Sequence, residues 1–161
     1  MDECSIDRFI ADYEGDDSCI RFEWNGKHDD DFKDANEAFR SDVIDRVIAH
    51  PSDVQLKLIA GLYRALTHFS AEAWCIDDRV EALARLMINK GGPAVSRDFI
   101  IGAMESFDAQ CAAVFTGAQK EMVGQCLEDA QTKLDAAKDE NERTIWLFAL
   151  EHFAKLRRYA T

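Results

Sequence analysis

The chain has 161 residues, of which 47% are hydrophobic and 31% charged, with a formal net charge of −12. This length is typical of one domain with its own core, and the composition is unlike that of a disordered chain. The acidic balance disfavours binding to nucleic acid or to an anionic membrane surface, because both repel a negatively charged protein.

Cysteine usage and hydropathy indicate the compartment. The five cysteines are an odd number without paired spacing, and the acidic N-terminus lacks the apolar core of a signal peptide. No apolar run approaches the roughly 20 residues that span a bilayer. We therefore expect a reduced, cytoplasmic protein.

The negative charge is concentrated in the first third of the chain. Residues 1–50 hold 15 acidic and 6 basic side chains, a net charge of −9, whereas residues 51–161 hold 16 and 13. We expect a single helical domain over residues 1–161, in which the acidic N-terminal third (1–50) packs on a nearly neutral helical body (51–161).

Apolar residues recur with helical spacing along most of the chain. Ser5 is expected to cap the first helix, and Pro51 stops the second. Ser52-Asp53-Val54-Gln55 has the pattern of a capping box that opens the third. Gly91-Gly92-Pro93 is the strongest break, after which Ser96 is expected to cap another helix. The predicted helices cover residues 5–13, 34–50, 52–69, 76–87, 96–114, 122–134 and 139–158.

The last predicted helix begins at Asp139 and ends in Arg157-Arg158, which suits the helix dipole. Because residues 145–150 are apolar nearly all round, we expect this helix to lie between others near the centre. About seven helices with short connections predict an all-α fold. It is either an antiparallel bundle or a short HEAT-like stack.

A short internal sequence similarity bears on the choice between the bundle and the HEAT-like stack. Residues 58–61 match residues 99–102 at an offset of 41, with Gly61 and Gly102 at equivalent positions. A period near 40 with paired helices is typical of HEAT-like repeats. Apolar spacing alone would relate any two amphipathic helices, so only the glycine adds information.

Residues 18–28 depart from the helical pattern. Ile20, Phe22 and Trp24 alternate with charged residues, and Asn25-Gly26 is a common hairpin turn signal. The acidic run that follows does not resemble a strand. The sequence therefore predicts one extended, non-helical arm near residues 18–28.

Acidic residues surround two aromatic side chains in and around this arm. A charged rim around an aromatic anchor is typical of protein interfaces, because it combines fast association with a strongly bound centre. The alternative is a solvated acidic loop with Trp24 packed inward. The candidate partner-binding residues are Asp16, Asp17, Phe22, Glu23, Trp24, Asp29, Asp30, Asp31 and Asp34.

Motifs for metal binding and catalysis are weak. Residues 12–23 imitate the acidic order of an EF-hand loop, but Gly15 stands two positions before the required glycine. The sequence contains no His-Glu-x-x-His, no Cys-x-x-Cys and no phosphate-binding loop. We therefore expect no catalytic residues, no metal and no cofactor, and a protein that is not an enzyme.

The leading hypothesis is a non-enzymatic protein-binding module with a basic protein partner. Its concrete form is an inhibitor or immunity-type protein whose acidic surface masks a basic partner such as a nuclease toxin. One alternative is a structural or adaptor helical-repeat module that binds a peptide in an apolar groove. A second is an enzyme with an acidic metal pocket.

Overall fold

The computed structural model describes residues 3–28 and 31–161, with side chains from Ser5 onward. The predicted all-α fold is confirmed, and a single isolated β-bridge is present among the described residues. The elements, in chain order, are α1 (Glu3–Ala11), α2 (Glu37–Ala49), α3 (Leu56–Glu72), α4 (Arg79–Gly91), the 3₁₀ helix η2 (Gly92–Val95), α5 (Ser96–Ala103), α6 (Phe107–Val114), α7 (Lys120–Ala136) and α8 (Glu140–Leu156).

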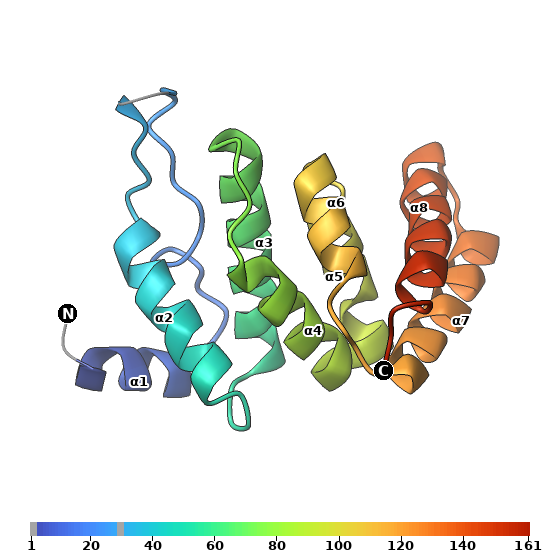
Figure 1. Ribbon diagram of the computed structural model, residues 1–161, viewed down its shortest axis with the longest axis horizontal. Helices are drawn as coiled ribbons and strands as arrows, with labels where there is room; N and C mark the ends of the chain where they lie inside the picture. Colours follow the sequence, from blue (N-terminus) through green and yellow to red (C-terminus); the bar gives the residue numbers. More distant parts are fainter. Residues whose placement is uncertain (1–2, 29–30) are drawn as a thin grey trace.

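The helices stand side by side in one row (Figure 1). The helices α1 and α2 lie at one end, the pairs α3–α4 and α5–α6 follow, and α7 with α8 forms the other end. Contacts run within each pair and between neighbouring pairs. Of the two arrangements that the sequence allowed, the structure has the short stack and not the antiparallel bundle. Each pair of helices packs mainly against the next pair along the chain.

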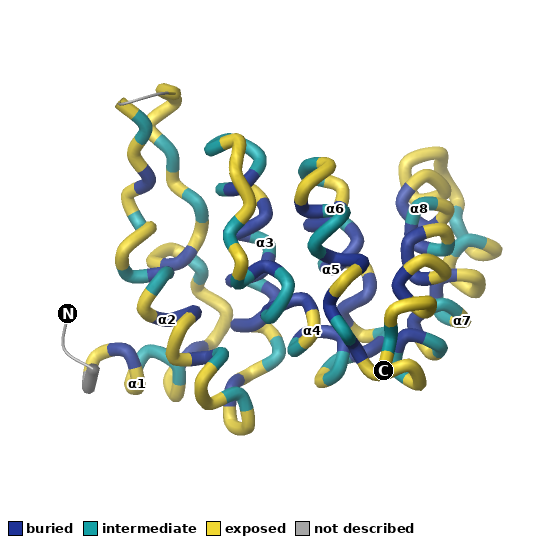
Figure 2. The backbone as a smooth tube through the Cα atoms, in the orientation of Figure 1, coloured by how far each residue is buried: buried dark blue, intermediate teal, exposed yellow. Residues whose placement is uncertain are grey.

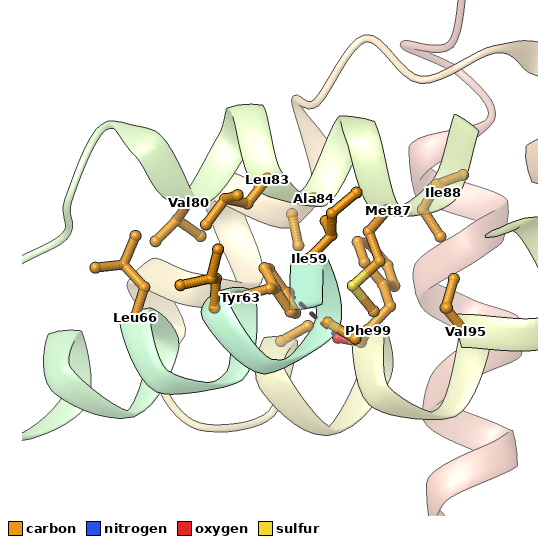
Figure 3. Close-up of a cluster of buried hydrophobic side chains, with 14 of the residues drawn as sticks. Ile59, Tyr63, Leu66, Val80, Leu83, Ala84, Met87, Ile88, Val95 and Phe99 are labelled. Atoms are coloured by element: carbon orange, nitrogen blue, oxygen red, sulfur yellow. Dashed lines mark hydrogen bonds between the residues drawn. The ribbon is translucent and has the colours of Figure 1, made fainter. Parts of the chain in front are cut away.

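The core follows the inner faces of this row, where Figure 2 shows the buried residues gathered. Figure 3 shows the part of the core where α3 meets α4 and α5. Ile59 and Tyr63 of α3 face Leu83 and Met87 of α4, and all four are fully buried. The Tyr63 hydroxyl donates a hydrogen bond to the Phe99 carbonyl at 3.2 Å, so its polar atom is satisfied inside the core.

The two glycines at equivalent positions of this internal similarity, Gly61 and Gly102, both lie at close contacts. A β-carbon at Gly102 would stand 2.4 Å from the Tyr63 ring, so α5 and α3 approach each other where Gly102 has no side chain. A β-carbon at Gly61 would stand 2.8 Å from the Asp17 carboxylate. Each glycine therefore accommodates the element that precedes it in the stack.

Several predicted boundaries are wrong for local reasons. The capping box at residues 52–55 does not form. The helix α3 begins at Leu56 without a side-chain cap, because Val54 is buried in the core and Gln55 stays extended. Ser96 is not a cap either, since it is buried in the first turn of α5 and donates to the Gly92 carbonyl.

The helix predicted over residues 96–114 is two helices. The helix α5 ends at Ala103, and the Ser106 side chain accepts a hydrogen bond from the Ala109 amide to cap α6. By contrast, the predicted cap at Asp139 is confirmed, since its carboxylate accepts from the Glu142 amide at 2.9 Å. A short polar residue therefore predicts a helix N-cap correctly only where the packing of its neighbours does not bury that residue or move the start of the helix.

The last helix, α8, packs between α7 and the α5–α6 pair, as its apolar sequence predicts. Its place near the centre was predicted wrongly, because α7 and α8 together form the end of the row (Figure 1). Within the described residues, no helix is both long and apolar enough to cross a bilayer.

Candidate functional site

The segment that joins α1 to α2, residues 12–36, is called the arm here. The predicted departure from helix is present, and the chain doubles back on itself. Trp24 and Asp34 form the isolated antiparallel bridge, and the Asn25 amide donates to the Lys33 carbonyl at 3.0 Å. Gly26 has φ +75°, the left-handed backbone that this turn requires.

A buried ion pair fixes the returning end of the arm to α2. Asp34 pairs with Arg40, and their side chains are 0% and 2% exposed. The other Asp34 carboxylate oxygen accepts hydrogen bonds from the amides of Glu23 and Asn36, each at 3.1 Å. Asp34 was predicted to contact a partner, but its carboxylate is enclosed within the protein, where it organises the arm.

Three further hydrogen bonds hold the outgoing part of the arm. The Asn36 side chain donates to the carbonyls of Ser18 and Arg21, each at 3.0 Å. The Tyr13 hydroxyl donates to the Asp17 carboxylate, and burial together with this carboxylate raises the pKa of Tyr13. Asp17, one of the predicted partner contacts, is half-buried and occupied by this bond.

Three of the predicted acidic residues remain exposed on the arm: Asp16, Glu23 and Asp31. Asp16 accepts from the Ser18 amide at 2.9 Å, which lowers the pKa of its carboxyl. The other two have surface ion pairs, Glu23 with Arg21 at 3.1 Å and Asp31 with Lys27 at 3.7 Å. Such exposed pairs contribute little to stability, so their carboxylates can exchange partners. Asp29 and Asp30 lie outside the described residues.

The aromatic residues of the arm pack on the C-terminal half of α3. Phe22 stacks against Trp24 and Phe32, with ring centroids 6.4 and 6.3 Å apart, and meets Phe69 of α3 edge-on at 5.9 Å. Trp24 is half-buried, and its indole nitrogen donates to the Lys27 carbonyl at 2.8 Å. Phe22 and Phe32 therefore attach the arm to α3 through Phe69, and Trp24 packs against these rings within the arm.

A pocket of about 280 Å³ opens where the arm meets the C-terminal end of α3. Its lining includes His28, Phe32, Glu37, Phe69, Glu72 and Trp74. The ring of His28 stacks on that of Trp74, with centroids 5.2 Å apart and 28° between the ring planes. Trp74 is 79% exposed and has φ +52°, which is rare for a bulky side chain.

Sequence reasoning missed this pocket, because its residues come from three separate segments. A signal for Trp74 was nevertheless present. It follows the apolar stripe of residues 58–69 but does not continue that stripe, so burial in the helical core does not account for it. Glu37 and Glu72 lie 35 positions apart, and no local pattern relates them.

Among the described residues, no three His, Cys, Asp or Glu side chains gather in a way that could hold a metal ion. Cys19, Cys75, Cys111 and Cys126 are free thiols. No family model, no curated protein and no solved structure matches the chain.

Proposed function

We propose that this protein is a non-enzymatic inhibitor or immunity-type protein whose acidic arm masks a basic protein partner, such as a nuclease toxin. The observation that carries the proposal is the way the arm is fixed. The buried pair of Asp34 and Arg40 holds it, and Asp16, Glu23 and Asp31 stay exposed. A surface that is ordered before binding loses less entropy on association than a disordered acidic tail would.

The mechanism would be competition for phosphate-binding side chains. A nuclease site presents lysine and arginine to the backbone of its substrate, and a fixed acidic surface attracts the same groups. Complementary charge also accelerates encounter by one or more orders of magnitude at low ionic strength. We place the partnership in the cytoplasm, where free thiols such as that of Cys126 stay reduced.

The experiment has two stages. The full chain is immobilised, incubated with lysate of its native cells, and washed at low and at high salt. A captured basic protein is then purified and assayed for nuclease activity with and without the chain. We expect stoichiometric inhibition, and inhibition at least tenfold weaker with the triple variant Asp16→Asn, Glu23→Gln, Asp31→Asn.

The matched control removes three exposed carboxylates from other places, Asp53→Asn, Glu128→Gln and Asp135→Asn. It changes the net charge equally, so it separates the arm from a general charge effect. Equal inhibition by both triple variants, or capture of partners that are acidic, would contradict the proposal.

The adaptor alternative has one observation in its favour. Met104 and Phe107, at the turn between α5 and α6, are 41% and 76% exposed, and they lie far along the chain from the arm. A peptide held there would bind through apolar contact and would be insensitive to salt. In that case Phe107→Ala would abolish capture, and the triple arm variant would not.

A further inference from the structure

We propose that the pocket between the arm and the C-terminal end of α3 binds an arginine side chain. The inference rests on the proposed function, because it names the group of the basic partner that is anchored. The residues that carry it are Phe69 and Trp74 as aromatic walls and Glu37 and Glu72 as anionic groups.

The walls suit a flat cation. Phe32 and Phe69 meet edge to face with centroids 5.7 Å apart, and His28 and Trp74 form a second aromatic pair. A planar guanidinium stacks on aromatic faces and is less strongly hydrated than an ammonium group, so burial between rings favours arginine over lysine. A volume of about 280 Å³ admits such a side chain.

The pocket has an excess of negative charge that a bound cation would neutralise. Glu37 and Glu72 form no ion pair with any residue that the structure describes. The helix α3 ends at Glu72, and its last turn contains no basic residue. The negative end of the α3 dipole therefore adds to the Glu72 carboxylate, whereas Glu37 lies at the positive end of the α2 dipole.

The same ring already binds an arginine of the chain itself. The guanidinium carbon of Arg40 lies 5.6 Å from the centroid of Phe69, while its nitrogen pairs with Asp34. This arrangement combines an aromatic face with a carboxylate, which are the two elements that the pocket also offers. Because Asp34 neutralises Arg40, the charges of Glu37 and Glu72 remain available to a second cation.

The conformation of Trp74 agrees with this role. A left-handed backbone is unfavourable for a bulky residue, and 79% exposure shows that core packing does not compensate for it. Glycine would adopt φ +52° readily, so Trp74→Gly removes the indole without straining the fold. This variant tests binding separately from stability.

The test uses the full chain labelled with ¹⁵N and three pentapeptides, acetyl-Gly-Gly-X-Gly-Gly-amide, where X is arginine, lysine or citrulline. Citrulline has the shape of arginine without its charge. We expect saturable shifts of the Trp74 indole signal with the arginine peptide, threefold or more weaker binding of the lysine peptide, and at least tenfold weaker binding of the citrulline peptide.

Two variants and their controls locate the site. Glu37→Gln with Glu72→Gln, and separately Trp74→Gly, should each weaken arginine-peptide binding at least tenfold. Glu128→Gln with Asp135→Asn removes equal charge elsewhere, and Phe107→Ala removes another exposed ring, so both should bind as the unmodified chain does. Equal binding of the arginine and citrulline peptides, or unchanged binding by Trp74→Gly, would overturn the inference.

The outcome separates the pocket from the proposed function. If the arm variant loses inhibition while the arginine peptide fails to bind, the pocket inference fails and the proposed function stands. If the arginine peptide binds as expected but the partner is inhibited equally by the arm variant and its control, the pocket stands and the masking function of the arm fails.

Discussion

The arm and the stack of α3–α8 are held together in different ways. In its described part, the arm fully buries few apolar side chains, such as Tyr13 and Ile20, and is fixed mainly by polar contacts that converge on Asp34 and Arg40. The stack buries a continuous apolar core from α3 to α8. We therefore expect a single substitution at the buried pair to loosen the arm, whereas the loss of one side chain in the stack is shared among many contacts.

The largest expected effect comes from breaking the buried pair. Arg40→Ala leaves the Asp34 carboxylate enclosed without its cation, which typically costs about 3–5 kcal/mol of stability. Urea denaturation measures the loss in the free energy of unfolding. Arg8→Ala is the matched control, because Arg8 and Asp12 form an exposed pair that contributes less than about 1 kcal/mol. Equal losses in the two variants would show that the arm does not depend on this pair.

The second effect belongs to the stack and depends on pH. His152 is buried between Phe99 and Phe148, and burial, with Lys155 nearby, lowers its pKa to about 4. The unfolded chain, with a histidine pKa near 6.5, binds more protons between these two values. Stability should therefore fall as the pH drops from about 6.5 to 4, by about 3 kcal/mol from this residue.

Thermal unfolding followed at pH 7, 6, 5 and 4 measures this dependence. His152→Leu should flatten the curve above pH 5, where most carboxylates stay charged in both states. The control is His50→Gln, which alters an exposed histidine and should leave the curve unchanged. An equally steep curve for His152→Leu would show that another group causes the acid sensitivity.

A smaller effect tests the close approach within the stack. Gly102→Ala would force a methyl group against the Tyr63 ring and should destabilise the protein by about 1–3 kcal/mol. Gly124→Ala is the control, because a β-carbon at Gly124 meets nothing within 4 Å in helix α7. It should stabilise by up to about 1 kcal/mol through helix propensity. If Gly102→Ala leaves the melting temperature unchanged or raises it, the contact at Gly102 is not restrictive.

Sequence patterns predicted correctly those features that depend on interactions between residues close together in the chain. The all-α class, the non-helical arm and the cap at Asp139 follow from periodicity, turn residues and a single hydrogen bond. The burial of Asp34 did not follow, because an acidic run is normally solvated. Its partner could have been found, since Arg40 occupies the same helical face as Val43, Ile44 and Val47, which are buried.

The pocket lay beyond sequence reasoning for another reason. Glu37 begins α2, Glu72 ends α3, and Trp74 follows in a turn, so only the packing of the arm on α3 brings them together. The break between α5 and α6 was missed because apolar spacing continues across residues 104–106. The spacing of apolar residues indicates which side chains face the core, but it does not indicate where a helix ends and the backbone turns.

The central claim is that the exposed carboxylates of the arm steer a basic partner, and its most direct test is an association rate. Stopped-flow kinetics would follow the captured basic partner as it binds the unmodified chain, the triple arm variant and the charge-matched control between about 20 and 500 mM salt. We predict that the arm variant associates about fivefold or more slowly at low salt, with a flatter salt dependence, while the control changes little. Identical rates and salt slopes for the two variants would contradict the account.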